Sequence, residues 1–332
     1  MDVLGTVYYL IELLLVLSVV AFAIVAFLII ITVIYVKLAW EPVKGVCKSN
    51  ARLDGKTAIV TGGNAGIGLE TARDLASRGA TVVIACRNAK KSAEAIEDIT
   101  RTTGSTKVKY ISLDLAKFSS IRQFAEEFKR NHDRLDILVN NAGCAGLKPK
   151  ITEDGIDMVM QINYFGPFLL TQLLLDRLIA SKPSRIVIVS SQLYMIAKLD
   201  LSDLRGSRHK GGLVQYGNSK LCDVLWTKAL ARRLPEGVIA NVLHPGVVKT
   251  DIFDRVHPWV KKILYYILGL VFKTPKEGAQ TSIHLSVAEE LEGVSGHYFL
   301  ECKPVDTTKT TQDEDLIEKV WDQSLTLCGL KC

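Results

Sequence analysis

The longest uncharged stretch of the chain is an apolar run near its N-terminus, from Leu13 to Val36. In a helix, at ~1.5 Å per residue, this run is longer than the ~30 Å hydrocarbon core of a membrane. A cleaved signal peptide is the alternative, but such peptides have a basic N-terminal region and a shorter apolar run of roughly 7–15 residues. Here the N-terminal flank carries Asp2 and Glu12 and no basic residue. We therefore predict a short N-terminal segment, 1–12, followed by a permanent transmembrane anchor over 13–36.

Basic residues follow the apolar run closely, and none precedes it. They are Lys37, Lys44, Lys48, Arg52 and Lys56. Because positive charge is retained on the cytosolic side, this asymmetry predicts that the body faces the cytosol, at the endoplasmic reticulum membrane. The formal net charge of the whole chain is only +6, and much of the local excess lies in the basic juxtamembrane linker expected over 37–52. We therefore expect membrane lipid, and not nucleic acid, as the partner of this stretch.

The seven cysteines and six histidines do not follow the pattern of a metal site. The cysteines are scattered, odd in number and without a C-x-x-C pair, which fits neither a zinc site nor a disulfide framework. No two histidines stand at the spacing of metal ligands. His244, which precedes Pro245, is interpreted as a packing residue at a strand end. We expect no bound metal.

After the linker, short β-branched segments alternate with helical ones over a single expected domain, 53–332. The expected strands cover 57–61, 81–86, 108–115, 135–143, 184–191, 238–246 and 297–300. Strands that are apolar on both faces are typical of a parallel sheet covered by helices on both sides. Right-handed crossovers then predict an α/β fold with a doubly wound, mostly parallel sheet of Rossmann type. Its ligand is expected beyond the carboxyl ends of the strands.

A glycine-rich turn, TGGNAGIG, joins the first expected strand to a helix. Its glycines let the backbone adopt positive φ and let a phosphate approach closely. The helix that follows presents free N–H groups and the positive end of its dipole to an anion. The turn is not a P-loop, because Leu69 and not a lysine follows the last glycine. We predict a dinucleotide site at this turn. Its expected residues are Gly62, Asn64, Gly66, Ile67 and Gly68.

The end of the second expected strand indicates which dinucleotide binds. An NAD site usually has an acid about 20 residues after the glycines, which holds the ribose 2′-hydroxyl. The segment ACRNAKK has no acid at 85–88 and has Arg87 there. An arginine can pair with a 2′-phosphate through two hydrogen bonds. We therefore predict NADP(H) as the cofactor.

Six motifs, in this order, together resemble the short-chain dehydrogenase/reductase family. They are TGGNAGIG, NNAG at 140–143, Asn163, Ser191, YGNSK at 216–220 and PGVVKT at 245–250. Flanking phrases such as CRN, PSRIVIVSS, SKL and KTPKEGAQTS are similar to the retinol dehydrogenase branch, in which an N-terminal anchor is also usual. The resemblance implies an enzyme that interconverts a small lipophilic alcohol and its aldehyde or ketone. Retinol and retinal are the first expectation, and steroids and fatty aldehydes stay open.

The pattern Tyr-x-x-x-Lys occurs twice, in YMIAK at 194–198 and in YGNSK at 216–220. Tyrosine and lysine four residues apart share a face only on a helix. YMIAK directly follows an expected strand and has no helical start signal, whereas YGNSK opens a segment with apolar residues at helical spacing. We predict that Tyr216 and Lys220 form the catalytic pair and that the earlier copy is a chance match.

The resemblance assigns roles to the residues that match the family motifs. Tyr216 is the general acid or base, Lys220 favours its phenolate form and holds the nicotinamide ribose, and Ser191 hydrogen-bonds the carbonyl oxygen. Asn163 positions the lysine and a relay water. The remaining expected cofactor contacts are Asp114, Asn141, Ala142, Gly143, Pro245, Gly246 and Thr250. Family members often pair through the helices around the tyrosine, so a homodimer is one option.

An apolar segment, WVKKILYYILGLVF at 259–272, lies within the stretch 251–273 where the family places its substrate lid. It is too short to span a membrane. Of two interpretations, a buried lid helix and a helix in the membrane interface, the second is favoured because the anchor already holds the body there. Two functions without turnover also stay open: an NADP-binding membrane scaffold, and a structural protein of the lipid surface. The intact serine, tyrosine and lysine favour an enzyme.

Overall fold

The computed structural model describes residues 3–40, 44–145, 149–208, 212–248 and 273–330. They fall into two units, and the unit that holds the sheet begins at Gly45. The lid expected over 251–273 lies outside the described residues, except for Lys273.

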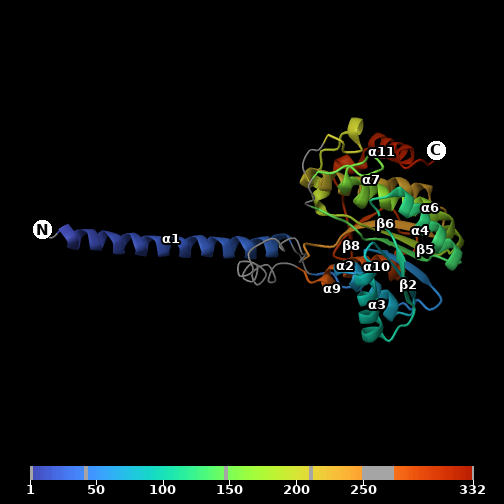
Figure 1. Ribbon diagram of the computed structural model, residues 1–332, viewed down its shortest axis with the longest axis horizontal. Coiled ribbons are helices and arrows are strands. Elements are labelled where there is room, and N and C mark those ends of the chain that lie inside the picture. Colours follow the sequence, from blue (N-terminus) through green and yellow to red (C-terminus); the bar gives the residue numbers. More distant parts are fainter. Residues whose placement is uncertain (1–2, 41–43, 146–148, 209–211, 249–272, 331–332) are drawn as a thin grey trace. The chain divides into compact units, whose positions relative to one another are not determined.

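Helix α1 (Val3–Trp40) is a single uninterrupted helix (Figure 1). Within it, Gly5–Thr32 is long and apolar enough to cross a membrane, and none of that stretch is buried in protein. The hydroxyls of Ser18 and Thr32 donate to backbone carbonyls three and four residues earlier, at 2.7 and 2.8 Å. Hydroxyls that are satisfied within the helix avoid the cost of an unpaired polar group in hydrocarbon. The helix extends beyond both ends of the anchor expected over 13–36.

Within the described residues the strands form one eight-stranded sheet in the order β3-β2-β1-β4-β5-β6-β7-β8. The strands are β1 (Thr57–Thr61), β2 (Thr81–Cys86), β3 (Val108–Ser112), β4 (Ile137–Asn140), β5 (Ser184–Val189), β6 (Val238–His244), β7 (Tyr298–Leu300) and β8 (Lys303–Val305). Neighbours pair in parallel except β7 and β8, which are antiparallel. The chain reverses its direction of winding between β1 and β4. This confirms the predicted doubly wound, mostly parallel sheet.

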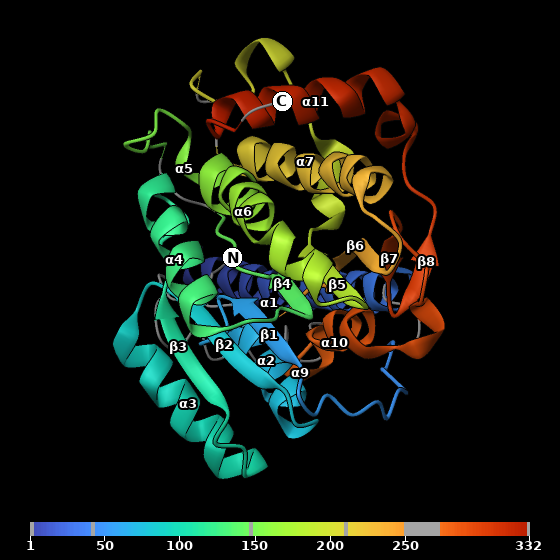
Figure 2. The same ribbon diagram turned by 90° about the vertical axis from the view of Figure 1, so that its right-hand side faces the viewer.

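Helices cover both faces of the sheet (Figure 2). One layer consists of α2 (Gly66–Ser77), α3 (Ala89–Thr103), α9 (Pro275–Gly278) and α10 (Gln280–Val287). The other consists of α4 (Phe118–Asn131), α6 (Gly166–Ala180) and α7 (Gly212–Arg233), and α11 (Glu314–Leu327) packs on the outer side of α7. Successive strand residues point to opposite faces, so Val60 belongs to the apolar core under the first layer and Ile59 to the core under the second. A second stretch that is apolar and long enough to cross a membrane, Met158–Ala180, is mostly buried in the second layer as a core helix.

Short helices lie in the connections between these elements. They are α5 (Met158–Met160), the π-helix η1 (Gln161–Phe165) and the 3-10 helices η2 (Gln192–Ile196), η3 (Leu201–Asp203), η5 (Glu289–Leu291) and η6 (Lys309–Gln312). A π-helical turn is rare and frequently occurs at a functional site. Here it lies between α5 and α6 and includes Asn163.

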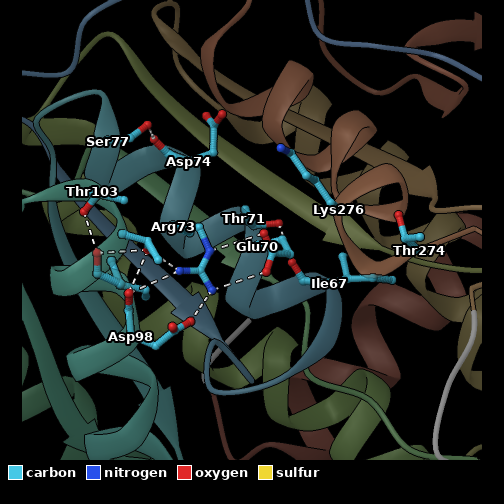
Figure 3. Close-up of polar contacts among 12 residues, drawn as sticks. Ile67, Glu70, Thr71, Arg73, Asp74, Ser77, Asp98, Thr103, Thr274 and Lys276 are labelled. Atoms are coloured by element: carbon cyan, nitrogen blue, oxygen red, sulfur yellow. Dashed lines mark hydrogen bonds and ion pairs between the residues drawn. The ribbon is translucent and has the colours of Figure 1, made fainter.

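A polar cluster ties α2 to α3 (Figure 3). Arg73 on α2 donates to Asp98 Oδ2 on α3 at 2.6 Å and to Glu70 Oε2 at 3.3 Å, and its Nη1 donates to the Asp98 carbonyl at 3.4 Å. The arginine side chain is about one-fifth exposed, so these charge-assisted bonds are only partly screened by water. They fix the helix whose N-terminus follows the glycine-rich turn.

The observed boundaries differ from the expected ones in places that shape the site. β3 and β4 are shorter than expected, because the chain leaves the sheet after Ser112 and after Asn140 to form loops at its carboxyl edge. The short edge strand β8 was not predicted. The sheet-bearing unit also begins before residue 53, because Cys47 N donates to Gln280 Oε1 at 3.1 Å and Ser49 Oγ donates to a carbonyl of α10 at 3.2 Å.

Candidate active site

The glycine-rich turn lies between β1 and α2 and favours glycine at three positions, two because of their backbone conformation and one because of a close contact. Gly62 and Gly66 have φ of +66° and +56°. A Cβ on Gly68 would lie 2.4 Å from both the Gly62 carbonyl oxygen and Asn141 Nδ2, whereas a Cβ on Gly66 would meet open space. The N-cap Ala65 has no side-chain acceptor, and the first turn of α2 carries no acid. The first N–H groups of α2 thus remain available to an anion such as a pyrophosphate.

The other two residues expected at this turn support it from the side. Asn64 Nδ2 lies 3.4 Å from Ser92 Oγ on α3. Ile67 packs toward α9, where a Cβ on Gly278 would lie 3.2 Å from its side chain. Both contacts hold the turn in place and direct these side chains toward protein.

Thr61 joins the turn to the loop after β4, a role that the sequence reasoning missed. Its hydroxyl accepts hydrogen bonds from Asn141 N at 2.9 Å and Ala142 N at 3.0 Å. Asn141 Nδ2 donates in return to the Thr61 carbonyl at 2.8 Å. In the sequence, this role was indicated only by the position of Thr61 as the last residue of a strand that precedes a glycine turn. These bonds place Asn141, Ala142 and Gly143 beside the glycine-rich turn.

Tyr216 and Lys220 share one face of α7. Lys220 is buried, and its Nζ lies 5.7 Å from the centroid of the Tyr216 ring. The ammonium donates to the Val189 carbonyl at the end of β5 and to Asp223 Oδ2, both at 2.9 Å. Tyr216 itself is half-buried and so can meet a ligand. A tyrosine ring beside a fixed ammonium suits a tyrosine that takes part in proton transfer.

The other Tyr-x-x-x-Lys copy has no such arrangement. Tyr194 belongs to the 3-10 helix η2, which ends at Ile196, so Lys198 lies outside that helix. Tyr194 is buried in the core, and its ring packs edge-on against Tyr298 with 5.2 Å between centroids. The two residues of this copy therefore do not share a helical face.

Ser191 lies at the start of η2 and accepts a hydrogen bond from Leu193 N at 3.3 Å. η2 packs closely on α7, since a Cβ on Gly217 would lie 3.1 Å from the Leu193 carbonyl oxygen. A second bond, from Lys198 N to Asn218 Oδ1 at 2.9 Å, ties the following loop to α7. This packing brings Ser191 to the same end of α7 as Tyr216.

Asn163 in the π-helix links the loop after β4 to α7. Its Oδ1 accepts from Cys144 N at 2.8 Å, and its Nδ2 donates to the Cys144 carbonyl at 3.0 Å and to Ser219 Oγ at 3.1 Å. A Cβ on Gly143 would lie 3.5 Å from Asn163 Oδ1 and 4.0 Å from Lys220 Nζ. The missing side chain of Gly143 therefore leaves space next to the lysine.

A family model described as short chain dehydrogenase matches residues 56–261. The chain belongs to the short-chain dehydrogenase family. It is therefore an oxidoreductase by family, and members of the family bind NAD(P).

Individual relatives confirm the resemblance to the retinol dehydrogenase branch. The chain is 41% identical to retinol dehydrogenase 12 of Mus musculus over 288 residues, which cover 86% of this chain and 90% of that protein. It is 43% identical to retinol dehydrogenase 13 of Mus musculus over 292 residues, covering 86% and 87%.

Solved structures of other proteins share the fold. A protein from Mycobacterium paratuberculosis is 27% identical, with a TM-score of 0.70 over 87% of this chain and 99% of that one. The RhlG/NADP active-site complex from Pseudomonas aeruginosa is 27% identical, with a TM-score of 0.60 over 75% and 95%.

Two of the remaining expected residues of this short-chain dehydrogenase, Arg87 and Asp114, follow the carboxyl ends of β2 and β3. Arg87 is exposed directly after β2. Asp114 accepts a hydrogen bond from Ala116 N at 3.0 Å, so its carboxylate caps the turn after β3. Thr250 lies outside the described residues.

The loop after β6 contains Pro245 and Gly246, and it rests on a buried lysine. Gly246 has φ of +85°, and a Cβ there would lie 2.8 Å from Lys273 Cδ. The neighbouring His244 is buried, and burial together with the charge of Lys273 lowers its pKa to about 4. It therefore stays neutral at physiological pH, which fits the packing role expected for it.

Asp223 is a second residue in contact with the site of this short-chain dehydrogenase that was not predicted from the sequence. It is fully buried, and burial raises its pKa to about 7 although Lys220 acts in the opposite direction. For Lys220, burial acts to lower the pKa, but Asp223 and Tyr216 outweigh it and the pKa is raised. In the sequence, the spacing of one helical turn between Lys220 and Asp223 could have indicated that the two side chains are in contact.

Proposed function

We propose that this short-chain dehydrogenase is a membrane-anchored, NADP(H)-dependent oxidoreductase that interconverts a lipophilic aldehyde or ketone and its alcohol, with retinal and retinol as the first substrates. The observation that carries the proposal is the Tyr216–Lys220 pair on one face of α7, with the lysine ammonium held 5.7 Å from the tyrosine ring. The retinol dehydrogenase names of its relatives support the substrate class.

The chain's own residues would divide the work as follows. When bound, the nicotinamide supplies or accepts the hydride at the substrate carbon. Tyr216 gives a proton to the substrate oxygen during reduction and takes it back during oxidation. Ser191 donates a hydrogen bond to that oxygen as negative charge develops. Lys220 holds the nicotinamide ribose and stabilises the phenolate of Tyr216. Asn163 fixes the loop that borders the lysine.

The cofactor side of the proposal rests on the glycine-rich turn and on Arg87. The free N–H groups of α2 would bind the pyrophosphate, and the loop of Asn141, Ala142 and Gly143 would border the nicotinamide half. Arg87 stands where an NAD site would have an acid, and its exposed guanidinium suits a 2′-phosphate. The NADP complex of a structural relative supports this choice.

The membrane side rests on α1 and on the basic residues that follow the apolar run. The length and hydropathy of Gly5–Thr32 favour a single-pass anchor. The basic flank favours a body in the cytosol, at the endoplasmic reticulum. The cytosolic NADP pool is mostly reduced, so net reduction of a membrane-dissolved carbonyl is the expected direction. Two copies would pair through the helices around Tyr216.

The substrate and the cofactor are tested together with membranes that contain the full chain. All-trans-retinal, a medium-chain aldehyde and a ketosteroid are each offered with NADPH and with NADH. We expect retinal turnover that requires NADPH. Turnover of another carbonyl would keep the reaction and reject retinal, and efficient NADH use with negligible NADPH use would reject the cofactor.

The role of Arg87 is tested by Arg87→Ala, with Lys90→Ala on the exposed start of α3 as the matched control. A charge-assisted bidentate pair contributes about 1.5–3 kcal/mol, so NADPH affinity should fall roughly 10- to 100-fold. NADH affinity should not change, because NADH lacks the 2′-phosphate. Equal losses for both nucleotides would contradict the assignment.

A further inference from the structure

Asp223 contacts the lysine of the active site from its buried side. It follows Lys220 by one helical turn on α7 and is 0% exposed. Its Oδ2 accepts from Lys220 Nζ at 2.9 Å, while its Oδ1 is buried and has no hydrogen-bond partner among the described residues. Burying a carboxylate with one oxygen unpaired costs free energy, so a residue of this kind calls for a functional explanation.

Among the described residues, the contacts of Lys220 use two of its three N–H donors and leave the third for a ligand. One donates to the Val189 carbonyl and a second to Asp223, both at 2.9 Å. The third is left on the side of the Tyr216 ring and of the space beside Gly143. Asp223 and Val189 together therefore fix the direction in which the ammonium acts.

We propose that Asp223 is a positioning residue that keeps Lys220 protonated and oriented toward Tyr216, and thereby maintains cofactor binding at alkaline pH. The inference rests on the proposed function in one respect, namely that Lys220 holds the nicotinamide ribose.

Other groups around the pair do not replace this carboxylate. Cys144 approaches from the loop after β4, Cys222 from α7 and Tyr164 from the π-helix. Burial raises the pKa of Cys144 to about 11 and raises the pKa values of Cys222 and Tyr164 well above their ordinary ranges. All three are neutral near pH 7. Asp223 itself is ionised above its pKa of about 7, and there it supplies the negative charge among the described neighbours of the lysine when Tyr216 is protonated.

Removing that charge should let the lysine lose its proton. Burial alone lowers the pKa of Lys220, and Asp223 contributes the largest opposing effect. An opposite charge at this distance typically shifts a pKa by about 1–3 units. Without it, Lys220 should deprotonate at least about one pH unit earlier, and a neutral lysine holds the ribose hydroxyls less well.

The experiment is an NADPH titration of the full chain in detergent micelles, followed by nucleotide fluorescence from pH 6 to about 11.5, because the Lys220 pKa in the wild type is raised above its ordinary value. In Asp223→Asn, which preserves shape, the pH at which affinity is half lost should fall by about one unit or more. In the Lys220→Arg background the same substitution should not move that pH, because a guanidinium stays charged. Thr227→Val is the matched control, since it removes a buried hydrogen bond to the Asp223 carbonyl without changing charge.

An unchanged pH midpoint in Asp223→Asn, with affinity lowered equally at every pH, would overturn the proposal. So would an equal shift in the Thr227→Val control or in the Lys220→Arg background. If Asp223→Asn does not fold, Asp223→Ala tests the same midpoint. A wild-type protein that does not bind NADPH at all would instead reject the proposed function, so the two failures are distinguishable.

Discussion

Lys273 and Glu301 form a buried ion pair beneath the loop after β6, and breaking it should lower both stability and cofactor affinity. The two side chains are 2% and 8% exposed, and the lysine ammonium donates to Glu301 Oε1. Glu301 Oε2 also accepts from Gly45 N at 2.5 Å, at the start of the sheet-bearing unit. The lysine stem packs against Gly246, so the pair supports a loop that the proposed function places at the cofactor.

Glu301→Gln leaves the Lys273 ammonium buried without a counterion. Removing one partner of such a pair costs about 3–5 kcal/mol. For a domain of this size class, each kcal/mol of lost stability lowers Tm by roughly 2–4 °C. The Tm of Glu301→Gln should therefore fall by about 6 °C or more. Thermal unfolding can be followed by the emission of the buried tryptophans Trp226 and Trp321.

Two comparisons make this prediction specific. Lys273→Met combined with Glu301→Gln removes both charges and should recover much of the lost stability. Asp54→Asn breaks an ion pair with Arg52 in which both side chains are more than 60% exposed, and it should leave Tm unchanged. A Tm for Glu301→Gln within 2 °C of wild type, or a double variant less stable than the single one, would refute the reasoning.

Three further predictions follow from the site and its surroundings. Gly68→Ala forces a Cβ within 2.4 Å of the backbone, so it should lower the free energy of unfolding by about 1–3 kcal/mol and abolish NADPH binding. In Gly66→Ala the new Cβ meets open space, so only the positive φ should matter, at about 1–2 kcal/mol. Thermal unfolding and NADPH titration compare the two variants. Burial acts to raise the pKa of Asp136, but Arg134 and other hydrogen-bond donors outweigh burial and lower that pKa. The ionised carboxylate therefore stabilises the fold above its unfolded pKa, and this contribution is lost as pH falls through the folded pKa. In Asp136→Asn the free energy of unfolding should fall less steeply as the pH is lowered. For Asp223 the folded pKa is raised to about 7, so stability should decline as pH rises from about 4 to 7, and this decline should be absent in Asp223→Asn at matched pH values.

Much of the fold was predictable because its signals are local. Alternating apolar strands and helical segments predicted the doubly wound sheet, which the structure confirms, and the run from Leu13 to Val36 predicted the apolar helix now seen as α1. The choice between the two Tyr-x-x-x-Lys copies was also local, because helical periodicity follows Tyr216 and not Tyr194. The edge strand β8 was missed because it has three exposed residues, one of them proline, and no alternating pattern.

The partners within the site depend on contacts between residues that are distant in sequence. Thr61 meets Asn141 only because β1 and β4 are neighbours in the sheet. Lys273 precedes α9 and Glu301 lies between β7 and β8, so the two side chains meet only when the chain is folded. Asp223 was visible at helical spacing from Lys220, but its complete burial follows from the packing of α7 on the sheet. No local pattern contains that information.

The measurement that tests the account most directly compares Tyr216→Phe with Tyr194→Phe in membranes that contain the full chain, using NADPH-dependent reduction of all-trans-retinal. We predict that Tyr216→Phe loses about 100-fold or more of the activity, the usual contribution of a general acid, while it still binds NADPH. Tyr194→Phe should retain activity within several-fold of wild type, because the ring of Tyr194 is buried in the core against Tyr298. Activity that survives Tyr216→Phe and is lost in Tyr194→Phe would contradict the assignment of the active site.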